Sequence, residues 1–96
     1  GFVQVIYKLM GIDLPRDAWQ QAQVGKSVKK FDEVQPGDLA FFDNRESIVH
    51  TGILLGNGEI IHASGSVRID DINSRGIINR ETGKRTARLR AIRRVV

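Results

Sequence analysis

The chain has 96 residues, which is enough for one hydrophobic core but leaves no room for a second, so we expect a single domain over residues 1–96. An apolar content of 41% and a charged content of 27% argue against a disordered chain, and the lack of cysteine excludes a disulfide within it. No apolar run approaches the ~20 residues that a membrane-spanning helix needs, so we expect no membrane span.

The first ten residues have the pattern of an amphipathic helix. Gln4 and Lys8 share its polar side, and Gly11 is placed to end it. Apolar side chains recur at helical spacing and predict a buried stripe made of Phe2, Val5, Ile6 and Leu9, widened by Val3 and Met10. Because the chain opens inside this helix and does not begin with Met, we expect it to be the C-terminal part of a longer protein.

A second, short helix is predicted over residues 18–23. Pro15 keeps the residue before it out of the helical region, and Asp17 stands where an N-cap is expected. A carboxylate at that position can accept hydrogen bonds from the first free amides of the helix. Trp19 is expected to pack against the rest of the domain from this helix.

The next segment is polar and then strongly apolar. Residues 26–35 predict a loop, and residues 36–38 predict a turn. The uninterrupted apolar run at residues 39–42 predicts a buried strand. The loop is expected to be anchored by three apolar side chains, Val28, Phe31 and Val34.

Residues 48–64 predict a β-hairpin, because two apolar runs are joined by Gly56-Asn57-Gly58. The chain contains two histidines, and one lies on each arm: His50 on the first and His62 on the second. The hairpin is therefore a candidate functional site as well as part of the core.

Two registers of this hairpin are possible. If residues 57–58 form a two-residue loop, Gly56 faces Glu59 and the two histidines point to opposite sides of the sheet. A one-residue change in the loop would turn one whole arm over, since side chains alternate along a strand.

The other register has a three-residue loop at residues 56–58. Leu55 then faces Glu59, Gly52 faces His62, and the two histidines are diagonal neighbours on one side of the sheet. Only this register lets the imidazoles cooperate, and Gly52 leaves room beside His62. We therefore predict the three-residue loop.

The remainder of the chain is expected to complete an antiparallel sheet. Residues 67–70 alternate and predict a strand, whereas residues 71–86 mix polar residues with glycine and predict mostly loop. The last predicted strand spans residues 86–96. Helices followed by a meander of strands indicate an α+β fold rather than alternating βαβ units.

The net charge of +4 is concentrated near the C-terminus: residues 1–66 carry a net −2 and residues 67–96 a net +6. A basic segment raises the possibility of nucleic-acid binding, which should weaken steeply with salt. However, the arginines alternate with Ala87, Leu89 and Ala91, as in a strand with one solvent-facing side. We expect them to belong to that strand, and we expect no nucleic-acid partner.

Taken in order, these segments resemble the NlpC and p-sixty family of bacterial cell-wall cysteine peptidases. The resemblance covers almost the whole chain, and each motif alone is weak. The matching blocks are Gly1-Phe2, Leu14-Pro15-Arg16-Asp17, Gln35-Pro36-Gly37-Asp38-Leu39 with Phe41-Phe42, His50-Thr51-Gly52-Ile53 with Gly56-Asn57-Gly58, and Ile61-His62-Ala63-Ser64.

The resemblance implies a papain-like domain with N-terminal helices packed on an antiparallel sheet. By match, His50 is the general base and His62 is the residue that orients it. The Leu-Pro-Arg-Asp block is similar to the subgroup that cleaves γ-D-glutamyl-diamino-acid bonds in peptidoglycan peptides. In that subgroup the positions of Asp17 and Ala18 help to hold the substrate, although serine is common at the second, so Ala18 would keep only backbone contacts.

One part of the family pattern is missing from the chain. The family motif reads Asp-Cys-Ser-Gly-Phe, and the present sequence starts at its Gly, so the nucleophilic Cys is expected just before Gly1. The family often carries SH3-like domains upstream, and its wall substrates imply a location outside the cytoplasm. A chain that truly lacks the nucleophile would instead bind peptidoglycan peptides without cutting them.

Neither a metal nor another cofactor is expected. Two histidines do not complete a metal site, and neither a cysteine nor a His-x-x-x-His spacing adds ligands. The expected partner is a peptidoglycan-derived peptide, bound by a monomer.

Overall fold

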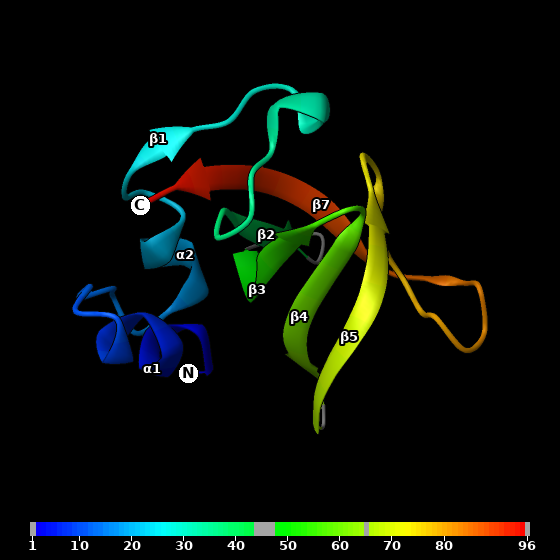
Figure 1. The fold of residues 1–96 in the computed structure, drawn as a ribbon, viewed down its shortest axis with the longest axis horizontal. Helices are drawn as coiled ribbons and strands as arrows, with labels where there is room; N and C mark the ends of the chain where they lie inside the picture. Colours follow the sequence, from blue (N-terminus) through cyan, green and yellow to red (C-terminus); the bar gives the residue numbers. More distant parts are fainter. Residues whose placement is uncertain (1, 44–47, 65, 96) are drawn as a thin grey trace.

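The computed structural model describes residues 2–43, 48–64 and 66–95. Two short helices lie on one side of an antiparallel sheet that forms most of the molecule (Figure 1). The elements in chain order are α1 (Phe2–Leu9), α2 (Ala18–Gln21), β1 (Lys26–Ser27), a 3₁₀ turn (Phe31–Glu33), β2 (Leu39–Asp43), β3 (Ile48–Gly56), β4 (Glu59–Ser64), β5 (Ser66–Asn73), β6 (Gly76–Ile78) and β7 (Arg85–Arg94). The predicted order of helices before strands and the antiparallel pairing are confirmed.

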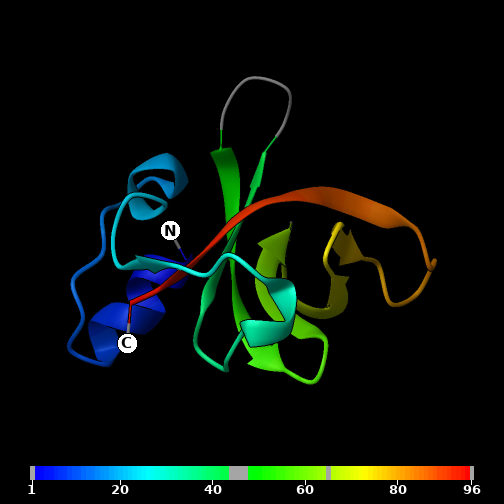
Figure 2. The same cartoon turned by 90° about the horizontal axis from the view of Figure 1, so that it is seen from above.

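The sheet is barrel-like because its last strand, β7, pairs with β2 and also with β6. Its order is β1-β7-β2-β3-β4-β5-β6, and β6 also pairs with β7. In Figures 1 and 2, β7 runs across the molecule from the β5–β6 end to the side of the helices. This closure was not predicted: residues 71–86 were expected to be mostly loop, but they contain the end of β5 and all of β6.

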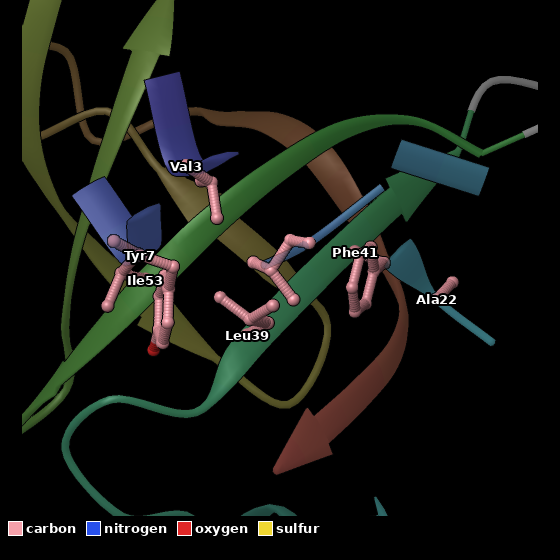
Figure 3. Close-up of a cluster of buried hydrophobic side chains, with 7 residues drawn as sticks. Val3, Tyr7, Ala22, Leu39, Phe41 and Ile53 are labelled. Carbon is pink, nitrogen blue, oxygen red and sulfur yellow. The ribbon is translucent and has the colours of Figure 1, made fainter. Parts of the chain in front are cut away.

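β2 lies at the centre of the core. This position explains why residues 39–42 are apolar without interruption. Leu39 and Phe41 face the helices, while Ala40 and Phe42 face the interior of the barrel, and all four are almost completely buried. Figure 3 shows Leu39 and Phe41 among side chains from α1, β3 and Ala22, the residue that follows α2. A strand that is buried on both faces has no place for a polar residue.

α1 packs against this core with a face that matches the predicted stripe only in part, since Val3 is buried and Phe2 and Ile6 pack against the core as predicted. Val3 and Tyr7 are buried, one helical turn apart, whereas Val5 and Leu9 are 56% and 81% exposed. Met10 is exposed as well. The helix is therefore rotated about its own axis relative to the prediction. The side that carries Val3 and Tyr7 packs against β2 and β3. Neither helix of the described chain has the length and hydropathy needed to traverse a bilayer.

Tyr7 ties α1 to the turn that precedes β2. Its ring is 1% exposed, and its hydroxyl donates a hydrogen bond to the carbonyl of Gly37. Burial, and secondarily the charge of Asp38, raises the pKa of Tyr7 above its usual value. The folded protein thus keeps this hydroxyl protonated and able to donate.

Tyr7→Phe is expected to lower the free energy of unfolding by about 1–2 kcal/mol, because it removes the donor for a carbonyl at the edge of the core. Urea denaturation would measure the loss. Above about pH 10 the wild type should lose stability, because the unfolded chain releases the tyrosine proton before the folded chain does. The variant lacks this hydroxyl, so its stability should fall less over the same pH range. Leu9→Ala, on the exposed side of the same helix, is the control and should change stability by less than about 0.5 kcal/mol. An unchanged Tyr7→Phe would contradict a stabilising role for the hydroxyl.

Several arginines of β7 pair with carboxylates on β2 and the turn before it. Arg94 Nε lies 3.0 Å from the buried carboxylate of Asp38. Arg88 and Arg90 both approach Asp43, at 3.3 and 3.6 Å. The predicted strand with arginines on one side is confirmed. These ion pairs add to the backbone pairing between β7 and β2.

Candidate active site

The turn between β3 and β4 has two residues, so the predicted three-residue loop is wrong. Gly56 pairs with Glu59, and the turn residues Asn57 and Gly58 have φ angles of 56° and 73°. Positive φ at both central positions is the geometry of a type I′ turn, which Asn-Gly favours and which matches the twist of a hairpin.

Glu59 therefore faces Gly56 and not Leu55 as predicted, but the predicted pairing of the rest of the two arms is confirmed. A bulge at Leu55 adds one residue to β3 between Leu54 and Gly56, which shifts the register back. Gly52 therefore faces His62, as the three-residue loop would have required, and His50 is its diagonal neighbour.

Gly52 provides the space that His62 needs. A Cβ atom at Gly52 would lie 2.5 Å from Cδ1 of Ile60 and 3.1 Å from Cβ of His62. Any side chain here would clash with the side chain of Ile60 and crowd Cβ of His62. The absence of a side chain at residue 52 thus helps to keep His62 in its position.

The two imidazoles are in direct contact. His50 Nε2 lies 2.9 Å from His62 Nδ1, and the rings meet edge to face with centroids 5.1 Å apart. His62 is buried, with 3% of its surface exposed, whereas His50 is half-buried. The ring of Phe42 lies beside His50, with centroids 5.7 Å apart, and limits its movement.

The contact continues to a carboxylate that was not predicted. His62 Nε2 lies 2.7 Å from Oδ2 of Asp70, which is 2% exposed. Arg68 donates to both oxygens of this carboxylate, from Nε at 2.9 Å and from Nη2 at 3.0 Å. The backbone N–H of Arg80 adds a hydrogen bond of 3.1 Å.

This chain of contacts fixes the positions of the hydrogens. An ionised carboxylate only accepts hydrogen bonds, so His62 must carry its hydrogen on Nε2. In neutral His62 the other nitrogen, Nδ1, then accepts, and His50 must donate from Nε2. The remaining nitrogen of His50, Nδ1, is left with a free lone pair, as a general base requires.

The surroundings favour these protonation states. Hydrogen bonding from Arg68, followed by that from the Arg80 amide and His62, lowers the pKa of Asp70 far below its ordinary value, although burial opposes the shift. Burial, and secondarily His62, lowers the pKa of His50. At neutral pH the site therefore holds an ionised Asp70 and a neutral His50.

His50 faces a pocket of about 270 Å³ between the helices and the hairpin. The predicted substrate residues Asp17 and Ala18 line it too. Asp17 occupies the predicted N-cap position of α2, but its carboxylate makes no capping hydrogen bond. The lining residues are Phe2, Val3, Arg16, Asp17, Ala18, Gln21, His50, Thr51 and Ala63.

Two lining side chains leave a polar atom unpaired. Oε1 of Gln21 and Oγ1 of Thr51 are buried and have no hydrogen-bond partner within the described chain. Buried polar atoms are normally satisfied, so these two are suited to a polar ligand. Within residues 2–43, 48–64 and 66–95, no group of three or more histidine and acidic side chains is arranged to hold a metal ion.

Similar proteins place the site in context. The sequence profile described as the NlpC/P60 family matches residues 1–86. A γ-D-glutamyl-L-lysine dipeptidyl-peptidase from Bacillus cereus is 38% identical over 91 residues, which cover 88% of this chain and 27% of that protein. The chain therefore spans about a quarter of the length of this relative.

Solved structures agree with the sequence match. A crystal structure of an NlpC/P60 family protein from Bacillus cereus superimposes with a TM-score of 0.77 at 33% identity, covering 97% of this chain and 30% of that one. RipD from Mycobacterium tuberculosis, described as a non-catalytic NlpC/p60 domain protein adapted to peptidoglycan binding, shares the fold with a TM-score of 0.73 at 24% identity, covering 100% and 64%. On the profile match and the identity to its relatives, the chain belongs to the NlpC/P60 family.

Proposed function

We propose that this chain is most of the catalytic domain of a cysteine peptidase that hydrolyses peptidoglycan peptides at the bond between γ-D-glutamate and a diamino acid. The observation that supports it most directly is the His50–His62 contact at the wall of a pocket shared with α1 and α2. The nucleophile would be a cysteine two residues before Gly1.

The position of α1 supports this assignment of the nucleophile. Phe2 and Val3, in the first turn of α1, line the same pocket as His50. A thiol at the start of this helix would meet free backbone amides and the positive end of the helix dipole, both of which favour the thiolate. His50 would stand on the opposite wall.

In this mechanism His50 Nδ1 takes the thiol proton, and the thiolate attacks the γ-carbonyl carbon of the substrate. The tetrahedral oxyanion is stabilised by backbone amides near the nucleophile. When it collapses, the C–N bond breaks and His50 returns the proton to the leaving amine. Water, deprotonated by His50, then hydrolyses the thioester and regenerates the thiol.

The pocket has the polarity that such a substrate needs. Arg16 and Asp17 provide one charge of each sign, and Gln21 and Thr51 offer unpaired oxygen atoms. A peptide with free carboxylates and an amine can use both kinds of group. Because peptidoglycan lies outside the cytoplasm, we propose that the protein acts there, on wall or released peptides.

The alternative is a domain of the same fold that binds the peptide and does not cut it, as the name of RipD describes for that protein. The two functions differ in the residue two positions before Gly1, where the peptidase would carry its cysteine. A bound peptide that is never cleaved would favour the alternative.

The test uses the full protein that contains this chain. Intact-mass and peptide mapping should find Asp-Cys-Ser before Gly1, and the protein should release diaminopimelate from L-Ala-γ-D-Glu-diaminopimelate, detected by mass spectrometry. Iodoacetamide should abolish the release, and the α-linked L-Glu isomer should resist cleavage. Binding of the peptide without turnover, or a residue other than Cys at that position, would overturn the peptidase proposal.

A further inference from the structure

The first part of β5, residues 66–70, presents its polar side to the protein and its apolar side to solvent. Val67 and Ile69 are 55% and 43% exposed, whereas Asp70 is buried and Arg68 is partly covered. In an ordinary amphipathic strand the arrangement would be the reverse. This inverted first part of β5 places a carboxylate and a guanidinium behind the histidine pair.

Burying these groups has a cost that the fold alone does not explain. An ion pair in the interior often contributes no more stability than apolar residues of the same size. The carboxylate of Asp70 also accepts from the His62 ring, so the charged pair is joined to the site and is not an isolated bridge.

We propose that Asp70 and Arg68 act together as positioning residues that hold His62 in the tautomer that accepts from His50, and so set how readily the His50–His62 pair takes up a proton. This inference rests on the proposed function only where it concerns turnover. Neither residue lines the pocket, so their effect reaches the substrate through the histidines.

Asp70 fixes the tautomer. By accepting from His62 Nε2 at 2.7 Å, it leaves Nδ1 as the acceptor for His50. Without that acceptor, His62 could carry its hydrogen on Nδ1, where it would oppose the hydrogen of His50 Nε2. The negative charge of Asp70 also stabilises the positive charge that His50 gains during the reaction.

Arg68 limits the effect of the Asp70 charge on the His62 ring. A buried, unpaired carboxylate beside His62 would favour a doubly protonated ring, which could no longer accept from His50. The guanidinium binds both oxygens of Asp70 and offsets its charge. Nδ1 of His62 can then continue to accept from His50 while the orientation of the ring is retained.

The other charged groups near the site are accounted for. Arg80 uses its backbone N–H toward Asp70, while its guanidinium pairs with Glu59 and Asp71. Glu81 lies 3.8 Å from Arg68. On the pocket side, Arg16 and Asp17 share the cavity with His50.

The test is an NMR titration of the two imidazoles in the full protein, assigned with His50→Ala and His62→Ala. Asp70→Asn should lower the pH midpoint of the His50–His62 pair by about one pH unit, and Arg68→Gln should raise it by about as much, since opposite charges are removed. Nitrogen-15 shifts should show His62 protonated at Nε2 in the wild type. The nucleophile is common to all variants, so its influence cancels.

Asp71→Asn and Arg88→Gln are the matched controls. Asp71 pairs with Arg80 and Arg88 pairs with Asp43, so neither should move the midpoint. Midpoints that stay fixed in both test variants, or that move in the same direction, would overturn the proposal. If Asp70→Asn does not fold, Arg68→Gln decides alone: a raised midpoint supports the proposal, and any other result overturns it.

Turnover gives an independent readout. In an active protein both test variants should lower kcat more than they change KM, because neither side chain reaches the pocket. If the titration gives the opposite shifts but the protein cleaves no peptide, the peptidase proposal fails and the positioning role stands. If the protein is active but the titration shows no opposite shifts, only the positioning role fails.

Discussion

Replacing His50 by alanine should reduce kcat/KM for the γ-D-glutamyl peptide by at least about 100-fold in the full protein. The variant would leave the proposed thiol in place but remove the only described base that faces the pocket from the hairpin. His50 is half-buried and its loss opens no deep cavity, so the fold should persist. Steady-state kinetics with product detection by mass spectrometry would measure the change.

His62→Ala should also reduce kcat, but by less, because Nδ1 of His50 remains while its orientation is lost. Asp32→Asn, in the exposed 3₁₀ turn, is the control and should retain full activity. Turnover of His50→Ala within a few-fold of the wild type would assign the base to another residue.

The largest effect on stability is expected at Gly76, where β6 meets β7. A Cβ atom at this position would lie 1.8 Å from the carbonyl oxygen of Ala87 and 3.1 Å from Cα of Arg88. Both neighbours are backbone atoms and cannot move as a side chain could. Gly76→Ala should therefore separate the two strands and lower the free energy of unfolding by at least about 3 kcal/mol.

Urea denaturation followed by circular dichroism would measure this loss. Gly11→Ala provides a matched comparison, since Gly11 also has a positive φ, of 82°, but its Cβ would meet open space. That variant should lose only the conformational cost of about 1–2 kcal/mol. Equal losses at the two positions would show that the contact with β7 is not what requires glycine at residue 76.

The hairpin shows how far local sequence determines a site. The Asn-Gly turn is encoded by the two residues that tolerate positive φ, and both alternatives contained that dipeptide. The bulge at Leu55 has no comparable signature, because an extra residue in a strand is selected by the neighbouring strands. The facing of Gly52 and His62 was therefore predicted correctly with the wrong loop.

β5 shows the opposite case. Alternation at residues 67–70 predicted the strand, but alternation alone does not say which side is buried. Asp70 is buried because His62, Arg68 and the Arg80 amide satisfy it, and these partners come from three separate places in the chain. The third member of the hydrogen-bonded chain was missed for that reason. A carboxylate eight residues after a histidine was the only available signal.

The pairing of β7 also determines when the molecule can fold. This strand joins β2, which lies about 50 positions earlier, and it closes the sheet against β6 and β1. A chain emerging from the ribosome can form α1 and the β3–β4 hairpin early, but no closed sheet before residue 94 has left the exit tunnel. Contacts of such high sequence separation form slowly. A growing chain of this kind therefore keeps its sheet open until synthesis of the domain is finished.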